Sequence, residues 1–364
     1  MQLKKIQNAD LKNKRVLLRA GFNVEIENGN VKEKFKIAAA KNTVEYILSQ
    51  ENTKLALVSH LGRPEGKFNQ GFSLRQITDD IGKILKRKVK FAEDCVGEKV
   101  KQELENLNQG EILLLENVRF HKEEEDNEKE FAERLAENFD VYVSDAFGVC
   151  HRDQASVTGV AEILPSFAGI RLQEEIKNLK KVKDNPEHPA AAVIGGAKIK
   201  TKLPLIRSFE KSYDYVLAGG KVSIEAADKN MKFGEKVILA FDFAKDKKDI
   251  GEKTIAQFKK IISQAKTVVW NGPMGEFEKH PFDKGTKEII KAIMESGAFS
   301  VAGGGESVQA LEENGWLEKI SFVSTGGGAM LEYLSGGQMP GLEVLANAKP
   351  RMLKRIRTNN LQSI

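Results

Sequence analysis

The sequence of 364 residues is 41% hydrophobic, which is enough for a large core, and its length suggests two or three domains. Charged residues make up 30% and are well mixed, and the net charge of +5 is too small to favour a nucleic-acid partner. The apolar run after the first lysines is only strand-sized, which argues against a signal peptide and a membrane span. Two cysteines, Cys95 and Cys150, fit a reducing compartment, so we expect a cytoplasmic protein.

Short apolar runs alternate with helical patterns along the chain, which is typical of parallel sheets covered by helices on both faces. In the first half the runs that predict strands are 15–19, 55–58, 112–115 and 141–143. The helical patterns between and after them are 37–48, 74–85 and 128–139. The charged run 122–126 (K-E-E-E-D) is expected to be a solvated loop and helix start without a function.

The predicted strands of the first half share one property, because Arg or His lies at or near the end of each. These residues are Arg19, His60, Arg63, Arg119, His151 and Arg152. Ligands of open parallel sheets lie beyond the carboxyl ends of the strands, so the fold would gather these cations at one edge. Clustered like charges are costly unless an anion joins them, which favours a small substrate with more than one negative group. The alternative is that each is a solvated loop residue.

A charged helical pattern over 166–183 suits a long connector, and the Asn185-Pro186 and His188-Pro189 pairs end it. We therefore expect an N-terminal domain over 1–167, an interdomain helix over 168–184 and a C-terminal domain over 185–340. The segment 341–364 is expected to dock on a neighbouring surface, such as the N-terminal domain, through Leu342, Val344 and Leu345, and to end in a solvated basic tail.

The second half repeats the alternation, with strands expected at 191–194, 215–217, 237–242, 267–270, 299–302 and 322–325. Five of these six strands end in glycines, which let backbone amides approach a ligand closely. Such an edge suits a polyphosphate and a flat base. The dinucleotide fingerprint G-x-G-x-x-G is absent, because Val308 fills its third position, and so is the Walker A loop.

The stretch around Gly195 and Gly196 is a strand, a glycine turn and a helix start, which point amides and a positive dipole end at an anion. Lys198 and Lys202 follow, four residues apart and so on one helix face. The alternative is a tight turn with solvated lysines. Taken together, the sequence predicts an α/β protein with two Rossmann-like domains joined by a hinge helix. A cationic edge facing a glycine edge indicates a phosphoryl-transfer enzyme.

Eight segments in this order make the chain resemble the phosphoglycerate kinase family over nearly its full length. They are R-V-L-L-R-x-x-F-N-V, S-H-L-G-R-P, L-L-L-E-N-V-R-F-H, S-D-A-F-G-x-x-H-R, G-G-A-K, W-N-G-P-M-G-x-F-E, G-G-G-E-S and S-T-G-G-G-A. The resemblance implies a monomeric kinase of glycolysis and gluconeogenesis. Such an enzyme transfers a phosphoryl group between ATP and the carboxylate of 3-phosphoglycerate, with Mg²⁺, giving ADP and 1,3-bisphosphoglycerate.

The resemblance also implies residue roles. Asn23, His60, Arg63, Arg119, His151 and Arg152 would hold the phosphoglycerate. Gly195, Gly196, Lys198, Lys202, Gly219, Asn271, Glu278, Gly304, Gly305 and Ser307 would hold the nucleotide, with Glu278 on the ribose. Lys202, Lys36, Gly326 and Gly327 would act on the phosphoryl group in flight, and Glu306 on the metal.

The chain departs from the family pattern at several of these positions. Gly21 replaces an aspartate that reads the substrate hydroxyl, and Glu25 replaces a proline. Lys36 replaces the catalytic arginine, which keeps the charge but loses the planar two-pronged donor. Gln154 replaces the last histidine of H-R-x-H, and Glu306 replaces an aspartate. Two alternatives therefore stay open, a catalytically impaired nucleotide-binding paralogue and a kinase for another small carboxylic acid.

Overall fold

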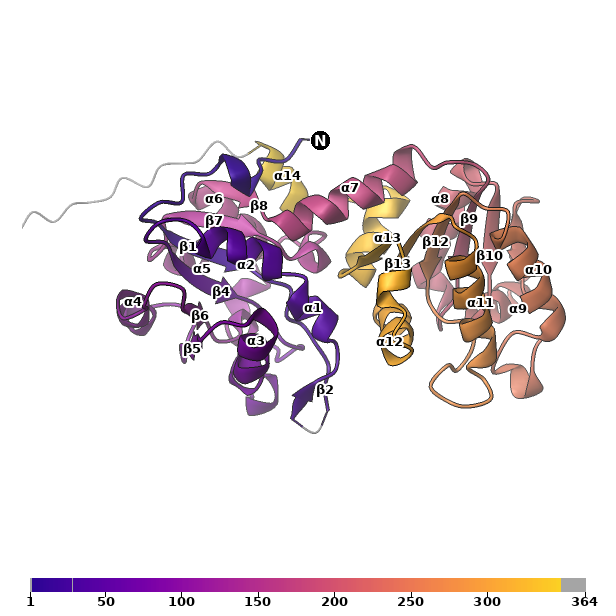
Figure 1. The fold of residues 1–364 in the computed structure, drawn as a ribbon, viewed down its shortest axis with the longest axis horizontal. Coiled ribbons are helices and arrows are strands. Elements are labelled where there is room, and N and C mark those ends of the chain that lie inside the picture. Colours follow the sequence, from indigo (N-terminus) through magenta and orange to yellow (C-terminus); the bar gives the residue numbers. More distant parts are fainter. Residues whose placement is uncertain (1, 28, 348–364) are drawn as a thin grey trace, which may run out of the picture.

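The computed structural model describes residues 2–27 and 29–347. It contains two six-stranded parallel sheets flanked by helices, and the long helix α7 (Ile170–Asp184) runs from one to the other (Figure 1). The predicted two-part α/β fold is confirmed. Within the described residues, none of the helices combines the length and apolar content that a bilayer span requires.

The first sheet has the strand order β5-β6-β4-β1-β7-β8. Its strands are β1 (Arg15–Arg19), β4 (Lys54–Val58), β5 (Val89–Phe91), β6 (Ile112–Leu114), β7 (Val141–Ser144) and β8 (Ser166–Ala168). Its helices are α1 (Lys34–Ala38), α2 (Lys41–Leu48), α3 (Thr78–Leu85), α4 (Glu98–Glu105), α5 (Lys129–Ala136) and α6 (Val160–Ile163). A small antiparallel pair, β2 (Ile26–Glu27) and β3 (Asn30–Val31), precedes α1. Along central β1, Val16 and Leu18 pack into one apolar cluster and Leu17 into the other, so both faces of the sheet are buried.

The second sheet has the order β11-β10-β9-β12-β13-β14. Its strands are β9 (Ala190–Ile194), β10 (Tyr215–Ala218), β11 (Val237–Leu239), β12 (Thr267–Asn271), β13 (Phe299–Gly303) and β14 (Phe322–Ser324). Its helices are α8 (Ile199–Ser212), α9 (Gly220–Asp228), α10 (Glu252–Ile262), α11 (Lys284–Glu295), α12 (Gly305–Glu313) and α13 (Gly327–Ser335). Three of these helices, α9, α12 and α13, start at a glycine directly after a strand, so their first amides lie along one edge of the sheet.

The predicted helix over 166–183 is wrong at its start, because Ser166–Ala168 form edge strand β8 paired with β7. The backbone N–H of Ile170 donates to Thr43 Oγ1 and that of Leu172 to Asp145 Oδ1, both at 2.9 Å. These side chains from the first half satisfy the first amides of α7 and fix where the helix begins.

Four other predicted elements differ in detail from the structure. The helical pattern over 37–48 is divided into α1 and α2, and a 3₁₀ turn, Leu74–Ile77, precedes α3. The strand expected at 237–242 ends at Leu239, and the predicted helix over 128–139 is the shorter α5. None of these differences changes the order of the sheets.

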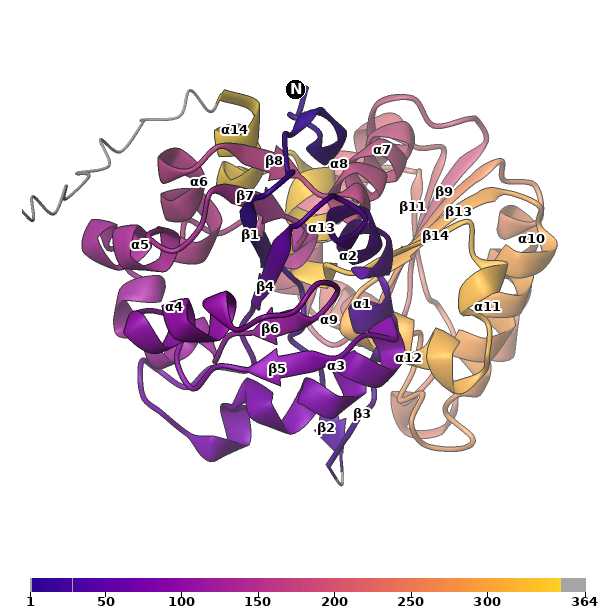
Figure 2. The same cartoon turned by 60° about the vertical axis from the view of Figure 1, so that its left-hand side comes forward.

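The last described helix, α14 (Pro340–Asn347), lies on the first half of the molecule beside α6 and β8 (Figures 1 and 2). The Gly341 N–H donates to the Cys150 carbonyl at 3.0 Å. Leu342 and Leu345 are buried in the same apolar cluster as Phe147. The basic residues predicted to form a tail lie outside the described residues.

Candidate active site

A cavity of about 220 Å³ lies where the two sheets approach each other. Its lining includes Gly21, Asn23, Lys36, His60, His151 and Arg152 from the first half, and Thr325, Gly326, Gly327 and Gly328 from the second. A β-carbon added to Gly328 would lie 3.9 Å from His151 Nε2. The cationic edge and the glycine edge therefore face each other across one small space.

His60 is buried at this edge and is held by Arg19, whose Nη2 lies 3.0 Å from His60 Nδ1. A guanidinium can only donate, so Nδ1 accepts and the proton of the neutral ring is on Nε2. Burial, with Arg19 and other nearby cations, holds the pKa of His60 well below its usual value. The sequence pattern counted His60 as a cation, whereas the structure makes it a neutral N–H donor.

Arg19 supports the site but does not line it, because its donors are already bonded. Its Nε donates to Ser156 Oγ at 2.8 Å and its Nη1 to the Ala20 carbonyl at 2.8 Å. Glu124 is fully buried nearby and accepts from Ser156 N–H at 2.8 Å and Ser156 Oγ at 2.6 Å. The expectation that the whole run 122–126 is solvated is therefore wrong at Glu124. A buried guanidinium needs a nearby opposite charge, and Glu124 supplies it.

Arg119 is also buried, and its Nη1 donates to the Gly62 carbonyl at 2.9 Å. Burial and the neighbouring Arg152 lower the pKa of Arg119 to about 10. Its Nη2, the Nε of Arg152 and the Nδ1 of His151 have no hydrogen-bond partner among the described residues. Buried polar groups are normally hydrogen-bonded, so these atoms are suited to an anionic ligand.

Lys36 lines the cavity with His151 and Arg152, whereas Arg119 is not part of its lining. Its Nζ donates to the Asn23 carbonyl at 3.1 Å and lies 2.6 Å from Glu33 Oε1. Asn23 Oδ1 accepts from the Gly62 N–H at 2.8 Å, which fixes the loop after β1 against the loop after β4. Arg63, by contrast, is exposed and does not line this cavity.

Two positions of the glycine edge leave no room for a larger residue. A β-carbon on Gly326 would lie 2.7 Å from the Gly148 α-carbon, and one on Gly327 would lie 2.7 Å from the Gly304 α-carbon. Glu175 of α7 accepts from Thr325 N–H at 2.7 Å and from its hydroxyl at 2.8 Å, which ties the connector to this loop. The start of α13, where the helix dipole is positive, thus points towards the cationic edge.

A second, larger cleft of about 510 Å³ adjoins the glycine edge. Its lining includes Gly196, Gly220, Lys221, Lys247, Lys248, Glu276, Glu278 and Glu306. Lys221, Lys247 and Lys248 come from the stretch between β10 and α10, and sequence reasoning missed them. These three lysines are not part of a recognisable sequence motif, so only the fold shows that they line the same cleft.

Lys202 lies next to this cleft, because a β-carbon added to Gly196 of its lining would lie 3.5 Å from Lys202 Cε. Lys202 Nζ contacts Asn271 Oδ1, and the Asn271 amide donates to the Gly303 carbonyl. Burial lowers the pKa of Lys202, and the nearby Glu306 partly opposes this shift. Lys198 is exposed at the N-cap of α8, so the two lysines do not share one environment.

The remaining predicted nucleotide residues shape the backbone of the glycine edge. Ser307 is fully buried and its Oγ accepts from the Gly272 N–H at 2.7 Å. Gly304 has a φ of +111°, which favours glycine, and Gly305 begins α12. Gly219 precedes α9, and the Gly195 N–H donates to the Asn271 carbonyl at 2.9 Å.

Comparisons with known proteins agree with this arrangement. The family profile described as phosphoglycerate kinase matches residues 6–247 and 234–337. A phosphoglycerate kinase of Leptospira biflexa is 39% identical, over 95% of this chain and 98% of the relative. A phosphoglycerate kinase of Borreliella burgdorferi is 38% identical, over 92% of this chain and 96% of the relative.

Two solved structures are similar over most of their length. The phosphoglycerate kinase of Coxiella burnetii has a TM-score of 0.78 at 31% identity, covering 95% of this chain and 99% of that one. The phosphoglycerate kinase of Pyrococcus horikoshii OT3 has a TM-score of 0.85 at 27% identity, covering 94% of this chain and 98% of that one.

Proposed function

This chain belongs to the phosphoglycerate kinase family, and from that premise we propose that it transfers a phosphoryl group reversibly between ATP and 3-phosphoglycerate. The products are ADP and 1,3-bisphosphoglycerate, a step of glycolysis and gluconeogenesis. One observation carries the proposal: the unpartnered ring and guanidinium nitrogens of His151 and Arg152 on the first half share a single cavity with Gly326 and Gly327 on the second.

On the acceptor side, Arg119, Arg152 and His151 offer free donors to the anionic groups of phosphoglycerate. His60 adds a neutral N–H donor that Arg19 orients. Asn23 also lines this edge of the cavity. Arg63 lies outside the cavity, so it would contact the substrate only if the loop that carries it moved when the substrate bound. The acceptor carboxylate is ionised at neutral pH, so the reaction needs no general base.

On the donor side, the nucleotide occupies the larger cleft, where Glu278 is available to the ribose. Lys202, next to Gly196 of the lining, is available to the phosphates. The first amides of α13 and the ammonium group of Lys36 stabilise the charge on the phosphoryl group in flight. Closure of the two edges excludes water, which otherwise competes for the phosphoryl group.

The donor set also suits Mg²⁺. The Glu306 carboxylate lines the nucleotide cleft, and no ion pair or side-chain hydrogen bond engages it within the described residues. A carboxylate oxygen is the ligand type that Mg²⁺ prefers. When bound, the ion neutralises negative charge on the phosphates.

We further propose that the enzyme is cytoplasmic and monomeric. Cys95 and Cys150 are free buried thiols, as in proteins of reducing compartments. Light scattering of the purified chain tests the monomer, because a dimer would double the measured mass.

A coupled assay with ATP, Mg²⁺ and 3-phosphoglycerate tests the activity, with the Lys202→Ala variant as the matched control. We expect steady turnover of the natural chain and a loss on the order of 10³-fold in the variant. Turnover no higher than that of Lys202→Ala would contradict the proposal. If there is no turnover, calorimetric titration with each substrate alone shows which half of the molecule does not bind its substrate.

A further inference from the structure

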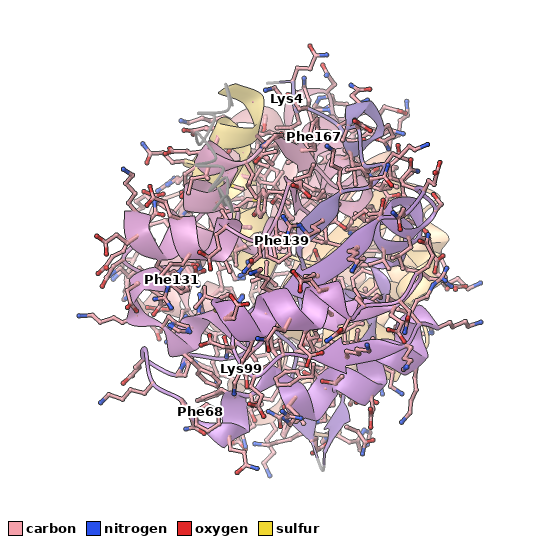
Figure 3. The ribbon with its side chains drawn as sticks, turned by 90° about the vertical axis from the view of Figure 1, so that its left-hand side faces the viewer. Lys4, Phe68, Lys99, Phe131, Phe139 and Phe167 are labelled. Atoms are coloured by element: carbon pink, nitrogen blue, oxygen red, sulfur yellow. The ribbon has the colours of Figure 1, made fainter. Side chains whose placement is uncertain are left out.

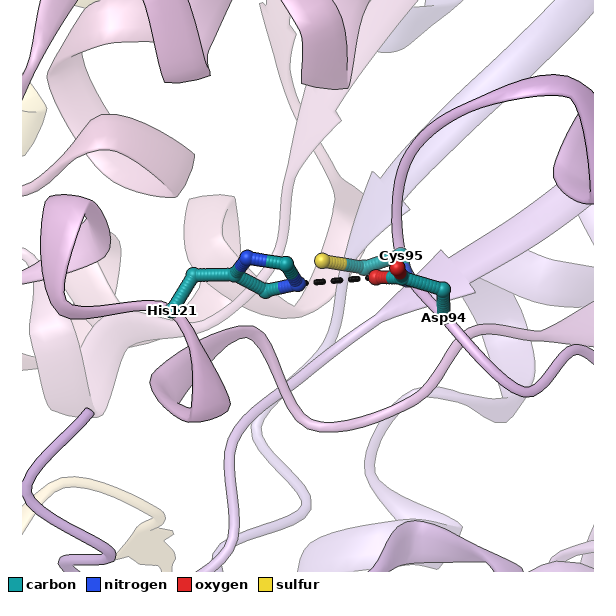
Figure 4. Close-up of side chains that lie close together, drawn as sticks. All are labelled: Asp94, Cys95 and His121. Atoms are coloured by element: carbon teal, nitrogen blue, oxygen red, sulfur yellow. Dashed lines mark hydrogen bonds and ion pairs between the residues drawn. The ribbon is translucent and has the colours of Figure 1, made fainter. Parts of the chain in front are cut away.

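Three side chains with metal-ligand chemistry meet at a second place on the first half, away from the cavity. Asp94 and Cys95 follow β5, and His121 follows β6, which is the neighbouring strand. His121 Nε2 lies 2.8 Å from Asp94 Oδ1, and the Cys95 thiol lies beside this pair (Figure 4). One ligand atom from each residue lies within 4.8 Å of the other two.

We propose that Asp94, Cys95 and His121 form a binding site for a transition-metal ion of the zinc class. Metal–ligand bonds of 2.0–2.3 Å in a tetrahedral site separate neighbouring ligand atoms by roughly 3.3–3.8 Å. The His121–Asp94 pair needs to open by about half an ångström for an ion to replace the shared proton. A thiolate, an imidazole and one carboxylate form a soft, mixed donor set that suits zinc and not Mg²⁺.

The surroundings keep the three groups in place and leave one side open. The His121 ring stacks on Phe131 at 4.9 Å, and the Cys95 N–H donates to Asp94 Oδ1 at 2.6 Å. The Cys95 residue is 1% exposed, whereas the Asp94 side chain is 42% and the His121 side chain 24% exposed. Phe131, on which the His121 ring stacks, is labelled in Figure 3. This open side lets an ion enter and leaves its fourth position for water.

Binding requires the Cys95 thiol to give its proton to solvent and the His121 proton to move to Nδ1. The thiolate, the imidazole Nε2 and the Asp94 oxygen then each bond to the ion. Affinity should therefore increase with pH. The ion would also fix the start of the segment that carries Glu124, which supports Arg19 and His60. This inference does not depend on the proposed kinase activity.

Cobalt(II) titration of the full chain tests the site, because cobalt takes zinc positions and gives a thiolate-to-metal charge-transfer band. The titration contains excess Mg²⁺ to occupy oxygen-only sites, and no nucleotide. We expect the band to saturate at one cobalt per chain. Cys95→Ala should abolish the band, and His121→Ala should weaken binding about tenfold or more. Cys150→Ala removes the only other thiol in the sequence and should keep the band.

Circular dichroism tests whether each variant is folded. If His121→Ala does not fold, Asp94→Asn replaces it in the titration, because that substitution removes the charge of one ligand and keeps its shape. Added zinc should raise the Tm of the natural chain and of Cys150→Ala but not that of Cys95→Ala. Absence of a charge-transfer band in the natural chain, or a band that persists in Cys95→Ala, would overturn the proposal.

Discussion

The ammonium group of Lys36 is held in place by two neighbours, the Asn23 carbonyl and the Glu33 carboxylate. It therefore has a defined position at the cavity although lysine is a flexible side chain. Glu33 Oε2 also accepts from the Glu25 N–H at 3.0 Å, so the loop after β1 and helix α1 are joined through this one carboxylate.

We predict that Lys36→Ala lowers kcat on the order of 10³-fold, because it removes one of the positive charges on the first half of the cavity. Lys36→Arg should retain most activity, since the charge remains. Steady-state kinetics with both substrates measures the effect. Lys34→Ala, an exposed lysine of the same helix, is the control and should behave like the natural chain. Equal kcat for Lys36→Ala and Lys34→Ala would refute a catalytic role.

Glu124 gives a second prediction at this scale. Glu124→Gln leaves the buried Arg19 without its opposite charge, so the free energy of unfolding should fall by about 3 kcal/mol. Because Arg19 orients His60, the KM for phosphoglycerate should also increase, while the KM for ATP should not. Urea denaturation and initial rates provide both readouts. Glu123→Gln, one residue earlier and partly exposed, should change neither.

At the scale of elements, the start of α13 is a closely packed position at the site. Gly326→Ala should lower the free energy of unfolding by about 1–3 kcal/mol, because its new β-carbon would lie too close to Gly148. Gly328→Ala meets only His151 Nε2 at 3.9 Å and should be tolerated in the fold. Denaturation curves of the two variants compare the costs directly, and similar values would show that the glycine edge is less tightly packed than described.

The start of α7 should make stability depend on pH through Asp145. Burial raises the pKa of this carboxyl to about 7, from an ordinary value of 3.8. A carboxyl whose pKa is raised in the folded state stabilises the fold most below 3.8, and this contribution is lost as the pH rises through about 7. The natural chain should therefore lose stability relative to Asp145→Asn between pH 4 and 8. A difference that stays constant over this range would show that Asp145 does not titrate in the folded protein.

At the scale of the whole molecule, the chain leaves the first half through α7 and returns to it with α14. A truncation after Gly337 removes α14, and with it the buried Leu342 and Leu345. A truncation after Asn347 keeps this helix. We predict that the shorter chain is less stable by about 2–5 kcal/mol, the cost of losing large buried side chains. Thermal and urea unfolding of the two chains would measure the difference, and equal stability would mean that α14 contributes nothing.

Much of this molecule follows from local sequence patterns. Alternating apolar runs and helical patterns predicted both parallel sheets. Arginines and histidines after the strands of the first half, and glycines after those of the second, predicted the two edges that meet. Patterns do not show which charged residue is buried, so Arg19 was taken for a ligand contact and Glu124 for a solvated residue. Arg19 and Glu124 are 105 residues apart in the sequence and are linked through the Ser156 hydroxyl, which only the fold reveals. The three-residue strand β8 was hidden because it is too short to interrupt a helical pattern.

The place of α14 has a consequence for how the protein is made. The ribosome completes this helix after all the strands of both sheets, yet the helix rests on the half that was synthesised first. The first half is therefore synthesised with the apolar surface at Phe147 uncovered. Leu342 and Leu345 cover this surface only after the whole second half has been synthesised. For folding, the second half is therefore an insertion within the first half. The part of the enzyme that is synthesised first is the last to complete its structure.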